Sequence, residues 1–124
     1  MTVTRYYGYY SVSISLGSSP ADCVVFQAIR QGVQDGHYFS IAPSIVRDPS
    51  QKLVATTVPF DRLVLESDAP ALGPVIRERN SPLNVLQTVD VLAELLGCSK
   101  ECVIETTTQN ALRLFPKLKN FVKL

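Results

Sequence analysis

The segment that most constrains the fold is residues 63–70, where a short apolar run ends in two carboxylates and is then stopped by a proline. Strand side chains alternate between faces, so a strand here would place Val64, Glu66 and Asp68 on one face. Both faces are apolar at the start of the run, which indicates a central parallel strand with acidic residues at its carboxyl end. That is the end at which α/β barrels place their chemistry. The pattern alone also allows an acidic turn that caps the next element.

The residues around this segment predict an alternation of helices and parallel strands. Ser19, Asp48 and Ser99 have the chemistry of helix N-caps, and Gly36 and Gly97 that of residues that end a helix. We therefore expect strands over 38–42 and 62–68, and helices over 20–34, 49–57, 84–96 and 100–115. Helices that alternate with buried strands are typical of an α/β fold with a parallel sheet.

Two apolar stripes indicate how the last helices pack. Val85, Val89, Leu92 and Leu96 recur at helical spacing on one face. The next helix is expected to turn apolar residues inward; these are Val103, Ile104, Ala111, Leu112 and Leu114. Both helices should cover the sheet with these faces.

The first residues carry a different signal. Residues 4–16 are rich in tyrosine and serine, and they alternate in the manner of a strand from Ser11 to Leu16. Three interpretations remain open: a strand that substitutes for one of the barrel, a disordered tail, or tyrosines that stack on nucleic-acid bases.

Composition bounds the class of protein. With 46% apolar and 19% charged residues, the chain has the make-up of one ordinary soluble domain. Its net charge of +1 gives no broad electrostatic argument for nucleic acid. Cys23, Cys98 and Cys102 show no CxxC spacing, and there is no signal-peptide or membrane-spanning apolar run. We expect an intracellular protein of the cytoplasm or nucleus, with free thiols and no membrane partner.

Four motifs occur in one order and spacing. They are residues 65–74 (LESDAPALGP), Arg79-Asn80-Ser81-Pro82, residues 107–115 (TTQNALRLF) and residues 38–47 (YFSIAPSIVR). In these motifs the chain resembles the C-terminal part of TatD-type deoxyribonucleases. The resemblance covers residues 21–124 and leaves residues 1–20 unrecognised. It implies a (β/α)8 barrel of the amidohydrolase type that holds divalent metal ions and hydrolyses the phosphodiester bonds of DNA.

Length conflicts with a complete barrel. Such barrels need about 200 to 250 residues, whereas this sequence has 124. We therefore expect an incomplete C-terminal portion of a TIM barrel, with about two parallel strands and their flanking helices. On this interpretation the chain is a shortened form.

The resemblance also assigns residues to roles. Asp68 matches the family's last-strand aspartate, which binds metal and helps to orient or deprotonate the attacking water. Glu66 matches the acid two residues earlier, whose expected role is to support the ligand or to pack inside the barrel. Arg77 and Arg79 lie on the following loop, where they contact a phosphate or simply face solvent. His37, the one histidine, falls at an aromatic position of the family, so we expect a loop or core-edge residue.

The departures from the family pattern leave two functional interpretations. The family's first-strand His-x-His pair, mid-barrel glutamate and two later histidines have no counterpart here. One carboxylate cannot assemble a two-metal centre, so metal binding by this chain alone should be weak or absent. The chain is therefore either part of a metal-dependent DNA hydrolase, completed by self-association or another chain, or it has no catalytic role. In the second case it is a remnant, as an unstable product, or a module that exposes barrel-core surface to a partner.

Overall fold

The computed structural model describes residues 2–6, 9–13 and 21–122. Its strands are β1 (Thr2–Tyr6), β2 (Tyr9–Ser13), β3 (Tyr38–Ile41) and β4 (Leu63–Leu65). Its α-helices are α1 (Ala21–Gln34), α2 (Pro49–Thr57), α3 (Val85–Leu96) and α4 (Lys100–Leu114). Short 3₁₀ helices, η1 (Pro43–Val46), η2 (Phe60–Arg62), η3 (Pro82–Asn84) and η4 (Pro116–Asn120), connect or extend them. Every helix expected after residue 20 is present within two residues of its expected ends.

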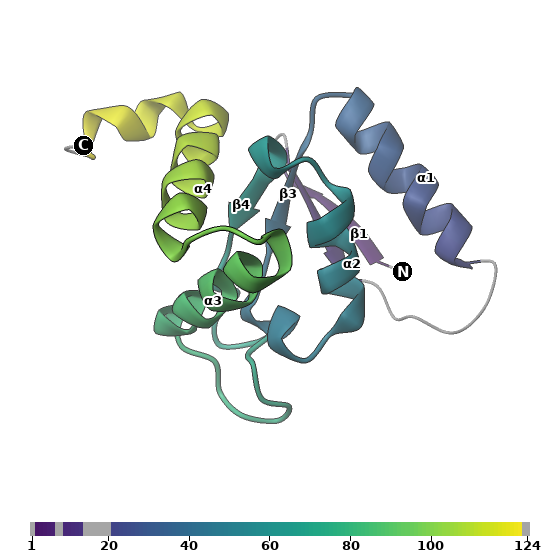
Figure 1. Ribbon diagram of the computed structural model, residues 1–124, viewed down its shortest axis with the longest axis horizontal. Coiled ribbons are helices and arrows are strands. Elements are labelled where there is room, and N and C mark those ends of the chain that lie inside the picture. The colour runs from purple at the N-terminus through teal and green to yellow at the C-terminus, as the bar shows by residue number, and fades with distance from the viewer. Residues whose placement is uncertain (1, 7–8, 14–20, 123–124) are drawn as a thin grey trace.

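The strands form one sheet in the order β1-β2-β3-β4 (Figure 1). β2, β3 and β4 run parallel to one another, and Phe39 pairs with both Tyr10 and Leu63. β1 turns back against β2 as an antiparallel hairpin. Of the three interpretations of residues 4–16, the structure supports strand over the described part: these residues belong to β1 and β2, and β2 lies beside β3.

Local capping explains where the helices begin and end. The Asp48 carboxylate accepts a hydrogen bond from the backbone N–H of Ser50 at 2.9 Å, at the start of α2. Gly97, with φ of 64°, ends α3 in the left-handed conformation that glycine adopts at least cost. Both roles were expected from the sequence. The expected cap at Ser19 lies outside the described residues.

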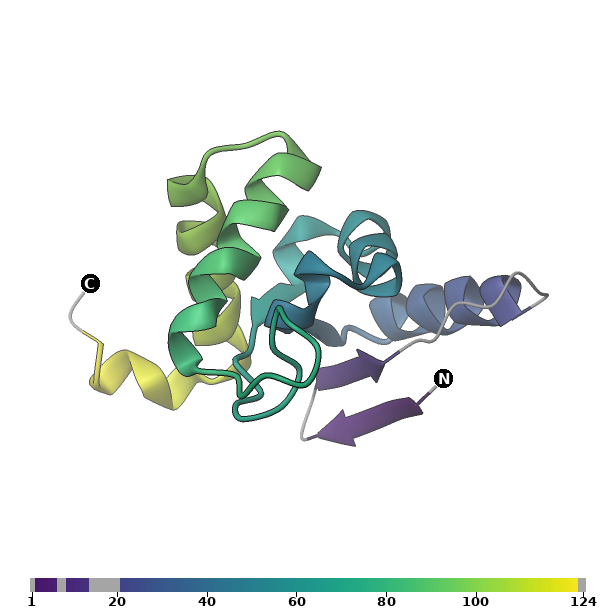
Figure 2. The same ribbon diagram turned by 90° about the horizontal axis from the view of Figure 1, so that it is seen from below.

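The core lies between the sheet and the helices. α3 and α4 pack side by side at one end of the molecule, and α1 lies at the other end with the sheet between (Figures 1 and 2). The buried apolar cluster is Ile29, Phe39, Ile41, Ile45, Val54, Ala55, Val58, Leu63, Val89, Leu92 and Val103. The expected inward stripe of α3 is therefore confirmed at Val89 and Leu92. The expectation that Ile104 faces inward is wrong. Ile104 is 48% exposed, because Val103 takes the core position and the next residue is turned by one helical step.

β4 is shorter than expected. It ends at Leu65, although the backbone N–H of Glu66 still bonds the carbonyl of Ile41 at 3.1 Å. Asp68 has φ of 51°, in the left-handed region, where a strand cannot continue. The expectation that Asp68 shares a strand face with Val64 is therefore wrong. Asp68 belongs to the turn that follows the strand.

Candidate functional site

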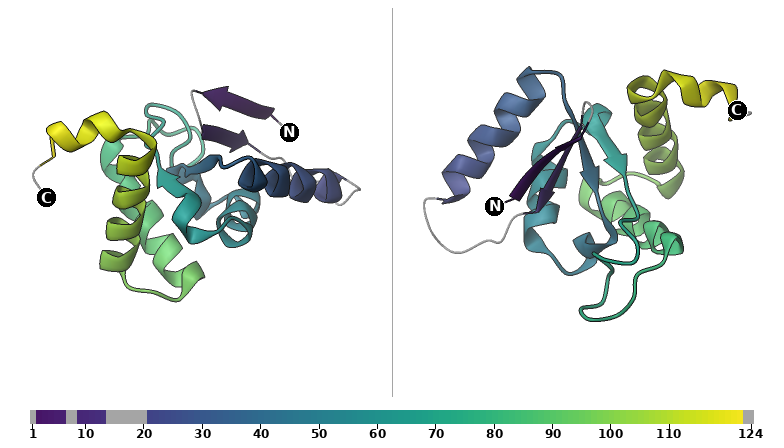
Figure 3. Two further views of the ribbon diagram at one scale, coloured as in Figure 1. Left: turned by 90° about the horizontal axis from the view of Figure 1, so that it is seen from above. Right: turned by 180° about the vertical axis from the view of Figure 1, so that it is seen from behind.

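The loop after β4, residues 66–81, carries Asp68 at the carboxyl edge of the parallel strands. It projects from the body of the fold (Figure 3). Asp68 is exposed, and its carbonyl accepts a hydrogen bond from the backbone N–H of Ala71 at 2.9 Å, which closes a turn. Aspartate tolerates the left-handed conformation better than most residues. The turn thus presents the carboxylate outward at the edge where α/β proteins bind ligands.

Asn80 holds this loop together. It is 4% exposed, and its Nδ2 donates to the carbonyls of Ser67 at 2.6 Å and Ala71 at 2.7 Å. Its backbone N–H donates to the carbonyl of Pro70 at 2.9 Å. Asn84, at the start of α3, donates to Asn80 Oδ1 at 2.9 Å. One side chain therefore ties both sides of the Asp68 turn to the helix that follows.

Gly73 allows the loop to close on Asn80. A Cβ at Gly73 would lie 3.0 Å from the Asn80 Cβ, which is closer than side chains ordinarily approach. The Gly73 carbonyl also accepts a hydrogen bond from Arg47 Nε at 3.0 Å, which links the loop to the segment after η1. Leu72, beside it, has φ of 48°, an uncommon conformation for a branched residue. Several bonds thus hold a loop whose backbone is strained.

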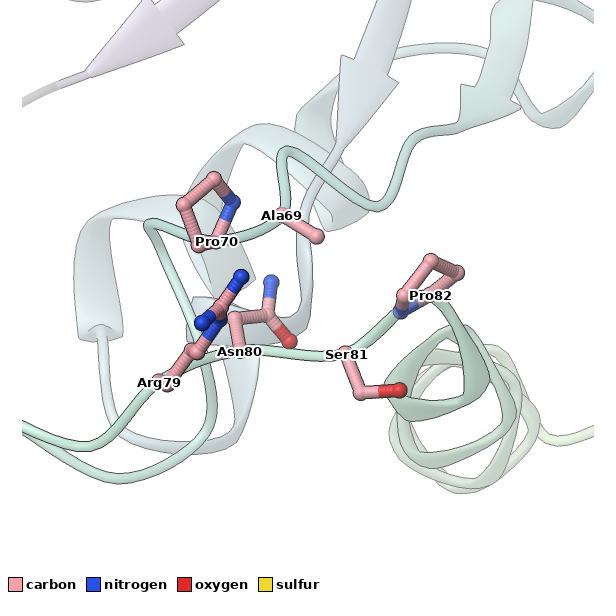
Figure 4. A pocket seen from close by; sticks show the side chains of 6 residues that line it. All are labelled: Ala69, Pro70, Arg79, Asn80, Ser81 and Pro82. Atoms are coloured by element: carbon pink, nitrogen blue, oxygen red, sulfur yellow. The ribbon is translucent and has the colours of Figure 1, made fainter.

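A hollow of about 420 Å³ opens next to the turn (Figure 4). Its lining residues are Ala69, Pro70, Arg79, Asn80, Ser81 and Pro82. Arg79 and Asn80 face Pro70 across it in the close-up (Figure 4). Arg77, with φ of 64°, and Arg79 are both exposed, and neither guanidinium has an ion-pair or hydrogen-bond partner in the described part of the chain. The loop therefore presents the exposed carboxylates of Asp68 and Glu78 and two available cations.

Glu66 belongs to a different cavity. This cavity, of about 150 Å³, lies between the sheet and the end of α4, and it is lined by Ser40, Val64, Leu65, Glu66, Ala111, Leu114 and Phe115. Glu66 is half-buried there, and the buried Ser40 hydroxyl beside it lacks a hydrogen-bond partner. The structure does not bring Glu66 and Asp68 into one cavity.

His37 and Asp68 lie at opposite ends of the parallel strands. His37 is half-buried in the turn before β3, where its backbone N–H donates to the carbonyl of Gly32 at 2.9 Å. β3 and β4 are parallel, so the residue before β3 and the turn after β4 are at opposite ends of the strands. Among residues that the structure describes, no three His, Cys, Asp or Glu side chains are grouped so that they could hold a metal ion.

Asn80 and Asn110 are the residues whose importance the sequence analysis missed. Asn110, on α4, is fully buried, and its Nδ2 donates to the carbonyls of Phe60 at 2.9 Å and Leu63 at 2.8 Å. It fixes the helix to the strand that leads to Asp68. The signal was present, because each asparagine lies within a motif that resembles the family. Nothing local indicated which carbonyls they would reach.

Parallel strands with helices packed on them, and a loop at their carboxyl edge that carries Asp68, are the arrangement of part of an α/β barrel. A family model described as TatD related DNase matches residues 25–116, so the chain belongs to the TatD related DNase family. The expected resemblance to TatD-type deoxyribonucleases is confirmed, and the chain is similar to the third vertebrate TatD-domain-containing paralogue within this family.

Two relatives and one solved structure illustrate the similarity. The human deoxyribonuclease TATDN3 is 44% identical over 93 residues, which cover 75% of this chain and 34% of that protein. The Escherichia coli protein YcfH, named an uncharacterized metal-dependent hydrolase, is 34% identical over 84 residues, covering 64% of this chain and 32% of its own length. The crystal structure of YJJV, a TatD homologue from Escherichia coli, matches the fold with a TM-score of 0.66 at 22% identity, covering 86% of this chain and 40% of that one. The chain spans about a third of the length of the curated relatives it matches.

In the described ranges, none of the helices combines the length and the apolar character that crossing a membrane requires.

Proposed function

We propose that this chain supplies the C-terminal part of a metal-dependent hydrolase that cleaves phosphodiester bonds in DNA, with Asp68 as a metal ligand. One observation carries the proposal: Asp68 is exposed on a loop held by Asn80, at the carboxyl edge of parallel strands. The names of the relatives support the reaction class, since one is called a deoxyribonuclease and another a metal-dependent hydrolase.

The donor chemistry of the loop fits part of such a site. A carboxylate oxygen is the kind of ligand that hard divalent cations prefer. When bound, the metal would supply an activated water and offset negative charge on the leaving oxygen. Asp68 would bind it and accept a hydrogen bond that orients the water. Arg77 and Arg79 would contact the phosphate oxygens, because their guanidinium groups are exposed beside the turn.

The described residues do not by themselves fit a two-metal centre. Asp68 is one ligand, and a centre that hydrolyses phosphodiesters uses several. We therefore expect the chain alone to be inactive, with the remaining ligands supplied by self-association or by another chain.

A second function, partner binding without catalysis, is favoured by the edge of the sheet. Within the described residues β3 is the one strand that pairs with β4. On the other side of β4 the Leu63 carbonyl is already bonded by Asn110 of α4, so a further strand could pair with the residues after Leu63. Open strand edges pair readily with other chains. The cavity that Glu66 lines adjoins this edge, and it would be covered by such a partner.

Activity of the purified 124-residue chain tests whether it assembles a working site by itself. The assay is nucleotide release from single- and double-stranded DNA with magnesium or manganese. We expect no metal-dependent release, and no difference between the chain and its Asp68→Asn variant. Metal-dependent cleavage that Asp68→Asn abolishes would show that the chain assembles a working site by itself.

A chimera tests the role of Asp68 in a complete protein. Residues 25–116 would replace the matching segment of the human deoxyribonuclease TATDN3. The chimera should keep nuclease activity, and Asp68→Asn should lower it by orders of magnitude, since the change removes both a ligand charge and an acceptor for the water.

The matched control in that chimera is Asp61→Asn. Asp61 is an exposed carboxylate in η2, before β4 rather than after it. It should leave the rate unchanged. Circular dichroism of each variant would show that it is folded. Equal rates for the Asp68→Asn variant and its parent would refute the assignment.

A further inference from the structure

The side of α4 that faces away from the core carries a hollow. Val103 and Thr107 are buried on the inner side of this helix. Successive residues of an α-helix are turned by about 100° from one another, so the residues one and two positions after Val103 lie toward the outer side. A hollow of about 430 Å³ runs along that side, and its lining residues are Glu101, Ile104, Glu105, Thr108 and Gln109. We call it the acidic groove.

The acidic groove combines negative charge with an apolar side chain. Glu101 and Glu105 lie one helical turn apart, and both are exposed. Neither forms a salt bridge with any residue that the structure describes, and Lys100 beside them pairs with Asp90 of α3 at 2.7 Å. Ile104, between the two glutamates, is 48% exposed. A segment that carries positive charge and apolar side chains would therefore complement the groove.

The same chain presents such a segment in residues 116–122, which we call the basic segment. Lys117 and Lys119 of η4 are exposed, and so are three large apolar side chains, Leu118, Phe121 and Val122. η4 leaves the end of α4 and points away from the body of the fold (Figures 1 and 2). Phe121 is 84% exposed. Apolar side chains that are exposed together and bordered by charge mark surfaces that bind other proteins.

We propose that the acidic groove of one copy binds the basic segment of a second copy, so that the chain associates with itself through α4 and η4. Lysines of the segment would meet the glutamates of the groove, and the apolar side chains of the segment would cover Ile104. The charge pattern favours a second copy as the occupant, because the complement of the groove lies on the chain itself and is held away from the fold.

The positions of the two surfaces allow a symmetric pair. Each copy carries both halves of the contact, so two copies related by a two-fold axis make the contact twice. From Glu105 to the end of α4 the helix rises about 14 Å. Two antiparallel copies of α4 would thus bring each basic segment to the groove of the other copy, with the two contacts apart from one another.

This surface is separate from the Asp68 loop and from the edge of β4. α4 contacts β4 through the side that carries Asn110, whereas the acidic groove lies on the outer side. Pairing at β4 would use backbone groups, which surface charge does not change. The proposal therefore does not depend on nuclease activity, and charge reversal distinguishes it from association at β4.

The experiment measures self-association of the 124-residue chain by sedimentation velocity over a range of protein concentrations. We expect a dimer whose dissociation constant rises with salt, because salt screens the charges across the contact. The variant with Glu101→Lys and Glu105→Lys places like charges opposite one another, and so does the variant with Lys117→Glu and Lys119→Glu. Each should weaken the dimer by at least about tenfold.

Restoring the charge complement identifies the contact. When the two reversed variants are mixed, each groove again faces a segment of opposite charge, so the mixture should associate although neither variant does so alone. A chain that carries all four reversals should also regain the dimer. Reversals that act only by disturbing the fold would restore nothing in either case.

Two matched controls change the same chemistry elsewhere. Glu94→Lys reverses an exposed glutamate of α3 and should leave the dimer unchanged. Phe121→Ala should weaken the dimer, whereas Leu83→Ala, at a residue of η3 that is also largely exposed, should not. Circular dichroism of each variant would show that the helices remain. A monomer at every concentration, a dimer that persists in both reversed variants, or reversed variants that stay apart on mixing would each overturn the proposal.

Discussion

Asn110 offers the sharpest test of how the fold supports the Asp68 loop. Its Nδ2 donates to the carbonyls of Phe60 and Leu63 at 2.9 and 2.8 Å, and the residue is 0% exposed. Asn110→Ala removes both N–H donors and leaves a buried carbonyl at Leu63 and a part-buried carbonyl at Phe60 without them. A buried polar group left without its partner costs about 1–3 kcal/mol. With the full cost at Leu63 and a smaller one at the part-buried Phe60, we expect a loss of about 2–4 kcal/mol.

Native-state hydrogen exchange measures this loss where it occurs. The amides of β4 and of the middle of α4 report the free energy of local opening, even when global unfolding is not two-state. A loss of about 2–4 kcal/mol corresponds to exchange on the order of 30- to 1,000-fold faster. The assay compares these amides between the chain and its Asn110→Ala variant.

Two further variants make the result interpretable. Gln109→Ala changes the exposed neighbour on the same helix and should shift stability by no more than about 0.5 kcal/mol. Asn110→Asp keeps the size of the side chain but turns a donor into an acceptor that faces two carbonyls, so it should be at least as damaging as alanine. The reasoning fails if exchange in Asn110→Ala stays within a factor of two of that in Gln109→Ala.

Three other predictions concern the loop, the metal and the sheet. Asn80→Ala should speed proteolysis and hydrogen exchange across residues 66–81 more than Asn84→Ala does. The reason is that Asn80 donates to two carbonyls of the loop, whereas Asn84 donates to a single oxygen of Asn80. Equal effects of the two variants would contradict the central role of Asn80. Calorimetric titration of the chain with manganese or zinc should show weak binding and no two-metal site, and His37→Ala should leave any binding unchanged. Two tight stoichiometric sites, or a large loss on changing His37, would show that these assignments are wrong. Thermal unfolding should be weakly cooperative or depend on association, since a small parallel sheet with open edges is poorly stable alone; a sharp two-state transition of a monomer would argue against an incomplete barrel.

The sequence predicted features that depend on a few neighbouring residues. Asp48 and Ser99 cap their helices through residues two and three positions away, and Gly97 ends α3 through its own conformational freedom. Such signals need no knowledge of the rest of the fold. The positions of the helices followed from them and from the apolar stripes.

Features that depend on distant partners could not be predicted in this way. Asn110 reaches carbonyls 50 and 47 residues earlier, and Asn80 reaches one 13 residues earlier. The left-handed conformation of Asp68 also escaped prediction, because alternation assumes an extended backbone throughout. The resemblance pointed to Asp68 as a site residue, but it gave neither the turn that presents it nor its separation from Glu66.

Because of the hairpin at the start of the chain, the two edge strands of this sheet run in opposite directions. β1 runs opposite to β2, whereas β2, β3 and β4 share one orientation. A strand of the parallel set can therefore join at β4 in the common polarity, while any strand that joins at β1 meets a reversed neighbour. A (β/α)8 ring consists of parallel strands alone. A partner that extends the sheet from β4 would thus build an open, one-sided assembly, and closure into a ring of parallel strands would require β1 to leave the edge of β2 first.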